Sequence, residues 1–152
     1  MDINIKNTAI EKAKKYGIDP LLVQAVILQE SSGRPTVSRY EPSFFKSYIV
    51  PMKLEDGDES IGRATSWGLM QVMGQVAREM GYKGRFEDLY DPATGIEYGC
   101  KKLSQCVKRY PENLDSAIAS YNAGSARMIK GAFVNQGYVD SVKKYMEKLS
   151  KI

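Results

Sequence analysis

The sequence predicts a mainly α-helical protein that forms one domain over residues 1–152, with a single irregular or β-ribbon insertion at about 32–67. Apolar residues recur at helical spacing through most of the chain, and helix-start signals precede several of these stretches. Prolines and glycines interrupt the insertion repeatedly. A chain of 152 residues, 43% hydrophobic and 26% charged, is long enough to bury one core.

Two helices are predicted at the N-terminal end. The first covers residues 3–16 and ends at Gly17. Asp19 and Pro20 then supply an N-cap and a first-turn proline for a second helix that runs to about Ser31. This second helix is amphipathic and places Glu30 at its carboxyl end.

The insertion contains the one stretch that is rich in strand-forming residues. This stretch is Phe-Phe-Lys-Ser-Tyr-Ile-Val at 44–50, and the segment as a whole is where we expect a small β-ribbon or an irregular lobe. Residues 55–59 form an acidic turn, which we expect to be solvated.

Helical patterns return after Gly68. Five helices are predicted here, over residues 69–80, 91–110, 113–121, 125–130 and 138–149. The helix over 91–110 has the clearest apolar stripe, formed by Ile96, Cys100, Leu103, Val107 and Tyr110. Internal repeats and low-complexity segments are absent from the sequence.

Charge and cysteine content narrow the function classes. A net charge of +4 favours anionic partners, but the lysines are scattered, so we do not expect a nucleic-acid binder. Cys100 and Cys106 lie on different faces of a predicted helix, so they are expected to be packing residues without a disulfide. Two thiols without histidine make a poor metal site, and no cofactor is expected.

The N-terminal residues lack the apolar stretch of a signal peptide, and nowhere do about 18 apolar residues run together. We therefore expect synthesis in the cytoplasm without a signal peptide and no integral membrane segment. A monomer is the default expectation.

The absence of histidine directs attention to carboxylates. It excludes a Ser-His-Asp triad, a Cys-His pair and a His-Glu-x-x-His zinc site, and no glycine-rich phosphate loop occurs. Glycosidic bonds are the bonds most often cut by carboxyl groups alone. An apolar wall, the negative end of a helix dipole and exclusion of water each favour the protonated acid that such chemistry needs. Glu30 is therefore the candidate acid.

Four short strings occur in order along the chain. They are Gln-Glu-Ser at 29–31, Gly-Leu-Met-Gln-Val-Met at 68–73, Ala-Ser-Tyr-Asn-Ala-Gly at 119–124, and Tyr138-Val139 with Val142. Together they resemble the lytic transglycosylases of the soluble-murein type, which share a fold with goose-type lysozyme. The resemblance covers roughly residues 19–149 and implies an α+β lysozyme-like fold with a groove for peptidoglycan glycan strands.

The resemblance also implies roles for individual residues. Glu30 matches the catalytic acid/base, and Ser31 is the hydroxyl beside it. Substrate-binding positions are matched by Ser31, Met70, Gln71, Tyr121, Asn122 and Tyr138. Tyr121 is expected to stack on a sugar or bond to Glu30, or else to be a core tyrosine, and Trp67 is either a sugar platform or a core residue.

The chain departs from the family pattern in the 36 residues from Ser32 to Trp67, where the family usually has a short stretch. This segment carries Glu41. A lytic transglycosylase needs one carboxyl group, whereas an inverting lysozyme needs a second carboxylate to activate water. Glu41 is the candidate for this second catalytic role, and its alternative is a loop glutamate that is exposed or paired with Arg39.

Three function classes remain open from the sequence. The leading hypothesis is cleavage of the β-1,4 bond between N-acetylmuramic acid and N-acetylglucosamine, by transglycosylation or by goose-type hydrolysis. The second is a non-catalytic murein-binding structural module. A basic nucleic-acid binder comes last. For the first class we expect action on the cell wall, in the periplasm or outside, with phage-type release as one route.

Overall fold

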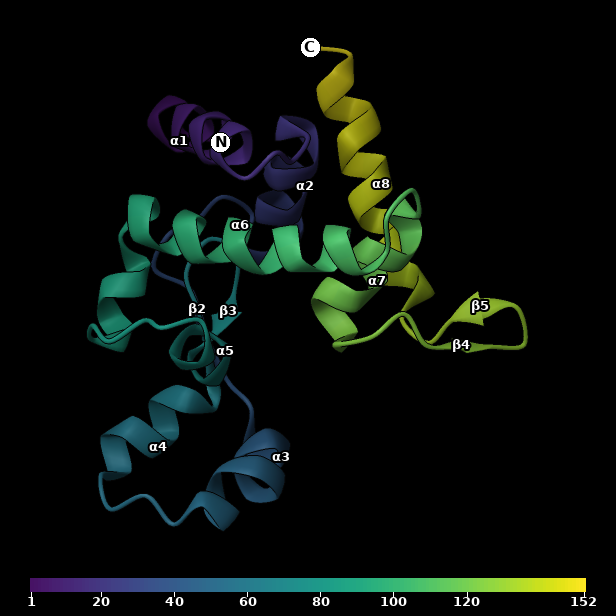
Figure 1. The fold of residues 1–152 in the computed structure, drawn as a ribbon. Helices are drawn as coiled ribbons and strands as arrows, with labels where there is room; N and C mark the ends of the chain where they lie inside the picture. Colours follow the sequence, from purple (N-terminus) through teal and green to yellow (C-terminus); the bar gives the residue numbers. More distant parts are fainter. The chain divides into compact units, whose positions relative to one another are not determined.

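Eight α-helices and two small antiparallel sheets make up the chain in the computed structural model, which describes residues 1–152 (Figure 1). This arrangement confirms the predicted mainly α, lysozyme-like class. The helices are α1 (Ile3–Lys15), α2 (Pro20–Ser31), α3 (Pro42–Phe44), α4 (Gly57–Arg63), α5 (Gly74–Glu79), α6 (Pro92–Arg109), α7 (Leu114–Ala123) and α8 (Gln136–Ser150). The strands are β1 (Ser38–Tyr40), β2 (Thr65–Trp67), β3 (Val72–Met73), β4 (Met128–Ile129) and β5 (Ala132–Phe133).

Two compact units divide the chain. One combines Met1–Gln29 with Cys100–Ile152, and the other is Glu30–Gly99. Both boundaries fall inside helices, within α2 and within α6. The chain therefore passes from one unit to the other through helical backbone rather than through linkers.

The first unit is helical apart from one hairpin. Asp2 caps α1, whose buried residues Ile5, Ala9 and Ala13 follow an i, i+4 spacing. Asn113 caps α7 by accepting a hydrogen bond from the amide of Ser116. The predicted helices at 3–16, 113–121 and 138–149 are thus confirmed, with small shifts at their ends.

Helix α2 is more deeply buried than its sequence pattern predicts. Asp19 accepts a hydrogen bond from the amide of Leu21 at 2.9 Å, as expected of an N-cap. Six consecutive residues are buried: Leu22, Val23, Gln24, Ala25, Val26 and Ile27. A helix that is buried all round is a core helix rather than an amphipathic surface helix. Residues 22–27 of α2 therefore belong to the core of the first unit.

The β-ribbon lies within the predicted insertion at 32–67, since β1 and β2 both fall inside it, but it does not use the strand-rich stretch at 44–50. In the second unit β1, β2 and β3 form an antiparallel sheet in that order, with Tyr40 opposite Thr65 and Trp67 opposite Val72. The predicted strand at 44–50 is wrong, because these residues form a short helix, a π-helical turn (Phe45–Ile49) and a 3-10 turn (Val50–Met52).

Local features explain why 44–50 is helical. Pro42 stands in the first turn of α3, where its missing N–H costs nothing. Phe44 and Tyr48 contact each other one turn apart, with ring centroids separated by 4.9 Å. Aromatic residues that favour strands in isolation here stabilise a helical turn.

The predicted helix at 69–80 is also only partly correct. Gly68 and Gln71 have φ angles of 76° and 50°, which bend the chain into a tight turn. Val72 and Met73 then pair with β2, and the helix begins only at Gly74. Pairing with a neighbouring strand has overridden the helical pattern.

A hairpin replaces the short helix predicted at 125–130. Strands β4 and β5 are joined by Lys130 and Gly131, whose φ angles are 53° and 81°. Two consecutive positive φ angles define the turn that suits the twist of a hairpin. The amide of Val134 closes it by donating to the carbonyl of Arg127 at 3.0 Å. Figure 1 shows the hairpin extending away from α7 and α8.

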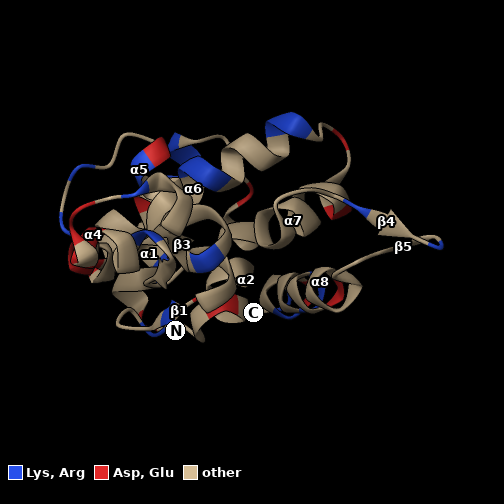
Figure 2. Ribbon diagram, turned by 90° about the horizontal axis from the view of Figure 1, so that it is seen from below, with Lys and Arg blue, Asp and Glu red and all other residues tan.

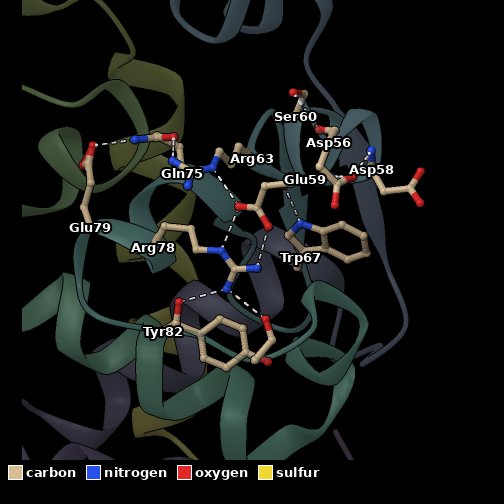
Figure 3. A network of polar contacts seen from close by, with 12 residues as sticks. Asp56, Asp58, Glu59, Ser60, Arg63, Trp67, Gln75, Arg78, Glu79 and Tyr82 are labelled. Atoms are coloured by element: carbon tan, nitrogen blue, oxygen red, sulfur yellow. Dashed lines mark hydrogen bonds and ion pairs between the residues drawn. The ribbon is translucent and has the colours of Figure 1, made fainter. Parts of the chain in front are cut away.

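A network of charged side chains connects α4 and α5 within the second unit (Figure 3). Arg78 donates through Nε and Nη2 to the two carboxylate oxygens of Glu59, both at 2.9 Å. Arg63 donates to Glu59 at 2.7 Å. The expectation that 55–59 is solvated is confirmed for the exposed residues 55–58 and is wrong for Glu59, which is held between two arginines.

Trp67 is a core residue, which answers one open question from the sequence. Its ring stacks on Phe86 with centroids 5.8 Å apart, and its edge contacts Tyr90. Its indole N–H donates to the carbonyl of Gly62 at 3.0 Å. The expectation that Trp67 is a sugar platform is not met, because the side chain is buried.

The two cysteines of the chain lie six residues apart. Cys100 is buried and Cys106 is half-buried, and no disulfide joins them, as expected. Helix α6 confirms the predicted apolar stripe at Ile96, Cys100 and Leu103, all fully buried. No helix combines the length and the apolar character that crossing a bilayer requires. Lys and Arg residues are spread over α1, α6 and α8 and the hairpin rather than gathered on one element (Figure 2).

Candidate functional site

Glu30 lies in the last turn of α2, as the sequence predicts. It is half-buried, and the next residue, Ser31, is buried. The carboxyl end of a helix carries partial negative charge, which disfavours an ionised carboxylate placed there. The catalytic role of Glu30 at this position stays a prediction.

Ser31 joins two of the four strings that the sequence singled out. Its hydroxyl donates a hydrogen bond to the carbonyl of Leu69 at 2.8 Å, although the two residues are 38 positions apart. Leu69 is the second residue of the Gly-Leu-Met-Gln string. The long insertion therefore leaves these two strings in direct contact.

The side chain of Gln71 holds the turn that follows Gly68. Its Nε2 donates to the carbonyl of Val37 at 3.0 Å and to the carbonyl of Gly68 at 2.9 Å. Gly68 is required here twice over, because its φ is 76° and a Cβ would lie 2.5 Å from the carbonyl oxygen of Leu89. Gln71 thus has a structural role alongside its predicted role in substrate binding.

Met70 is fully buried and lies against α6. Gly99 leaves the space for it, since a Cβ at Gly99 would be 2.3 Å from the sulfur of Met70. Met70 is predicted to line a cleft, but its side chain is fully buried and lies beneath the surface. A side chain with no exposed area supports neighbouring backbone rather than contacting a sugar directly.

Glu41 precedes α3, and its side chain forms an ion pair with Arg39. The Nε of Arg39 lies 3.2 Å from Oε1 of Glu41, and the two side chains are 76% and 34% exposed. This pairing corresponds to the alternative weighed from the sequence. A second catalytic carboxylate at Glu41 stays a prediction.

Tyr121 belongs to the first unit and is almost completely buried. The ammonium of Lys102 lies over its ring, 4.0 Å from the centroid. The ring is therefore enclosed, and stacking on a sugar is not an arrangement that this conformation offers. Its neighbour Asn122 is exposed at the end of α7.

Asn135 is a residue that the sequence reasoning missed. Its Nδ2 donates to Oδ1 of Asn122 at 2.9 Å and to the carbonyl of Ala119 at 3.0 Å. Its own carbonyl accepts from the amide of Tyr138, which is half-buried, at 3.0 Å. Asn135 thus connects the third and fourth strings. Its place three residues before the predicted helix at 138–149 was the available signal, but an asparagine near a helix start indicates a cap rather than a contact with a distant residue.

An open pocket of about 460 Å³ lies over the α4–α5 network and is lined by Glu59, Arg63, Gln75, Arg78 and their neighbours. Hydrogen bonds from Arg78 are the main reason that the pKa of Glu59 is lowered. The same contact raises the pKa of Arg78. Burial raises the pKa of Tyr82. These charged groups bond to one another, so the network beneath the pocket has a structural role: it connects α4 and α5 (Figure 3).

These features define the class of the protein. The chain is a helical, lysozyme-like protein in which a carboxyl group ends a buried helix beside a hydrogen-bonded serine. Residues 7–138 match the family model described as the transglycosylase SLT domain. The chain belongs to this family.

Two curated relatives agree with this assignment. The chain is 28% identical over 131 residues to the membrane-bound lytic murein transglycosylase E of Buchnera aphidicola, an alignment that covers 78% of this chain and 49% of the relative. It is 27% identical over 118 residues to the transglycosylase of Enterobacteria phage PRD1, covering 78% of this chain and 34% of that protein. The chain thus matches half or less of the length of each relative.

Proposed function

We propose that this protein is a peptidoglycan lytic transglycosylase. It cleaves the β-1,4 bond between N-acetylmuramic acid and N-acetylglucosamine, with Glu30 as the acid and then the base. The observation that carries the proposal is the hydrogen bond from Ser31 to Leu69, which connects the Glu-Ser and Gly-Leu-Met-Gln strings in a chain of the SLT family. The names of the two relatives support the same activity.

The chemistry needs only one carboxyl group. Protonated Glu30 gives its proton to the glycosidic oxygen as the bond from that oxygen to C1 of N-acetylmuramic acid breaks. The resulting carboxylate takes the proton of the C6 hydroxyl, and the C6 oxygen bonds to C1. The products are a 1,6-anhydro end and a free 4-hydroxyl, and Glu30 is protonated again without consumption of water.

The remaining residues bind and support. Asn122 and Tyr138 contact the glycan strand, while Ser31, Gln71 and Met70 hold the backbone around Glu30 in place. The contacts of Ser31 and Gln71 with main-chain carbonyls support this division. Tyr121, buried beneath Lys102, helps to shape the binding surface at the end of α7.

Product analysis tests the proposal. Purified protein is added to murein, and the soluble products are identified by mass spectrometry. We expect anhydro-muropeptides from the unaltered protein and a rate about 10²–10⁴ times lower for Glu30→Gln, which keeps the size but not the proton. Intact murein at every pH tried, or an undiminished rate for Glu30→Gln, contradicts the proposal.

The same experiment separates transglycosylation from hydrolysis. Glu41→Gln serves as the comparison, because it removes the second candidate carboxylate and leaves Glu30 unchanged. Anhydro ends in both proteins support the transglycosylase. Reducing ends that disappear in Glu41→Gln mean hydrolysis with Glu41 as the base. Murein that is bound but left uncut identifies a non-catalytic binding module.

We also propose that the site of action is the cell wall, in the periplasm or outside the cell. Both relatives carry names of transglycosylases, one membrane-bound and bacterial and the other from a phage. Fractionation of cells that express the protein from its natural source, followed by assay of each fraction on murein, tests this location.

A further inference from the structure

Asn122 is an exposed residue whose side chain is nevertheless fixed. An amide at the surface normally rotates, and either of its ends can face a ligand. Here Oδ1 of Asn122 accepts a hydrogen bond from Nδ2 of Asn135 at 2.9 Å. The side chain of Asn122 therefore has one end committed to the protein and the other end available.

The direction of this hydrogen bond is set by the main chain. Nδ2 of Asn135 also donates to the carbonyl of Ala119, which can only accept, so the nitrogen of Asn135 must face that carbonyl. The second proton on Nδ2 of Asn135 then points to Asn122, and Asn122 must accept it through its side-chain oxygen. Both N–H groups of Asn122 remain as donors.

Asn135 stands where a different role would be expected of it. It is the N-cap residue of α8, and asparagine at this position usually accepts a hydrogen bond from the first turn of the helix. Its side chain makes no capping hydrogen bond. Its Oδ1 is buried without a partner in the protein, so the usual stabilising contact is given up for the contact with Asn122.

We infer that Asn135 is a positioning residue that makes Asn122 a hydrogen-bond donor toward the glycan strand. This inference rests on the proposed function, because Asn122 is taken as a substrate-binding residue. The matching group on the substrate is an acceptor oxygen, and the acetamido carbonyl of an N-acetyl sugar is a strong neutral acceptor. A hydroxyl that must donate, or an ammonium group, is rejected at this position.

Two substitutions reverse or remove the donor while keeping the fold. In Asn135→Asp the residue no longer donates, so Asn122 turns its nitrogen inward and its oxygen outward. The carbonyl of Ala119 also loses its donor, so this variant is expected to fold with a lowered Tm, and Tm alone does not decide between a positioning role and a structural role. In Asn122→Asp the side chain still accepts from Asn135 but presents an acceptor to the substrate. Asn7→Asp, at an exposed position of α1, is the control for the added charge.

The test is a double-mutant cycle measured on murein glycan strands from which the peptides have been removed. We expect Asn135→Asp and Asn122→Asp each to raise KM about tenfold, the loss of one good hydrogen bond, with little change in kcat. We expect Asn122→Ala to raise KM similarly. In the Asn122→Ala protein, adding Asn135→Asp should change KM no further, because Asn135 acts only through Asn122.

A purely structural role for Asn135 gives a different pattern. It predicts that Asn135→Asp lowers Tm and kcat, and that its effect on KM persists in the Asn122→Ala protein. A lowered kcat for Asn135→Asp overturns the inference, and so does an effect of Asn135→Asp on KM that persists in the Asn122→Ala protein. The side-chain amide signals give a check without turnover: in a ¹⁵N NMR spectrum the Nδ2 protons of Asn135 should exchange slowly with solvent and those of Asn122 rapidly.

Binding of a tetramer of N-acetylglucosamine, followed by the same NMR signals, separates this inference from the proposed function. Binding that shifts the Nδ2 signal of Asn122 and is weakened by Asn135→Asp supports it, even if murein is not cleaved. Binding that both asparagine variants leave unchanged overturns this inference alone. Absence of both binding and cleavage in the unaltered protein overturns the inference together with the proposed function.

Discussion

Ser31 shows how a single hydroxyl can stabilise the surroundings of a candidate acid. It is buried beside Glu30, and its hydrogen bond reaches a main-chain carbonyl far away in the sequence. A buried carbonyl that loses its donor cannot recover the bond from water. The contact with Leu69 therefore gives Ser31 a structural role beside its predicted role in substrate binding.

We predict that Ser31→Ala lowers the free energy of unfolding by about 1–3 kcal/mol, because the carbonyl of Leu69 is left unsatisfied. For a chain of this length, each kcal/mol lowers Tm by about 2–4 °C. Thermal unfolding followed by circular dichroism measures the change. Ser38→Ala, on exposed β1, removes a hydroxyl from the same unit and should leave Tm within about 1 °C. Equal effects of the two substitutions would show that the Ser31 bond is unimportant.

Only part of the site could be predicted residue by residue. Glu30 and Ser31 lie where the helix pattern puts them, because a regular helix fixes the position of its last turn. Trp67 and Tyr121 are buried, and burial of an aromatic ring depends on distant neighbours that no local pattern reveals. Asn135 was missed for the same reason, since its partner Asn122 is 13 residues away.

At the scale of elements, the sequence was most informative where one helix is long and begins with a clear cap. Helices α1, α2, α6, α7 and α8 agree with their predicted ranges to within a few residues. The errors lie at 44–50, 69–80 and 125–130, where segments are short. In such segments a strand partner, a positive φ angle or an aromatic contact outweighs intrinsic propensity.

Helices α4 and α5 are connected by the carboxylate of Glu59, and this connection should depend on pH. The pKa of Glu59 is lowered from 4.5, mainly by hydrogen bonds from Arg78. A lowered pKa means that the ionised form is stabilised in the folded protein. The contribution to stability is therefore complete above the pKa of the unfolded state and is lost as pH falls through the folded-state pKa.

We predict that Glu59→Gln lowers the free energy of unfolding by about 1–3 kcal/mol at pH 7, a value between those of exposed and fully buried ion pairs. The difference from the unaltered protein should shrink as pH falls below about 4.5. Urea unfolding at a series of pH values measures it. Glu87→Gln is the matched control, because its pair with Arg85 is longer, at 3.7 Å, and exposed. A difference that is constant with pH rules out the ion pair as its source.

At the scale of the whole molecule, net charge bears on the proposed binding of murein. The chain carries a formal charge of +4, spread over several elements (Figure 2). Murein with its peptides carries carboxylate groups, so the two should attract each other at long range. Such attraction is screened over about 10 Å at 0.1 M salt.

We predict that KM for intact murein rises about threefold or more between 50 and 500 mM NaCl, while kcat changes little, because screening weakens encounter rather than chemistry. Initial rates at several salt concentrations measure this. An uncharged oligomer of N-acetylglucosamine is the control substrate, and its binding should not respond to salt. Equal salt dependence for both substrates would mean that the attraction is not electrostatic.

The β4–β5 hairpin offers a practical way to follow this protein at work. Its strands have two residues each, its turn is formed by Lys130 and Gly131, and the side chains of Met128 and Ile129 are about half exposed. Little buried surface depends on the tip, so extra residues there should cost little stability. A short fluorescent or affinity peptide placed between Lys130 and Gly131 would leave the closing bond from Val134 to Arg127 intact. The turn of this hairpin is thus the place in the first unit to attach a reporter.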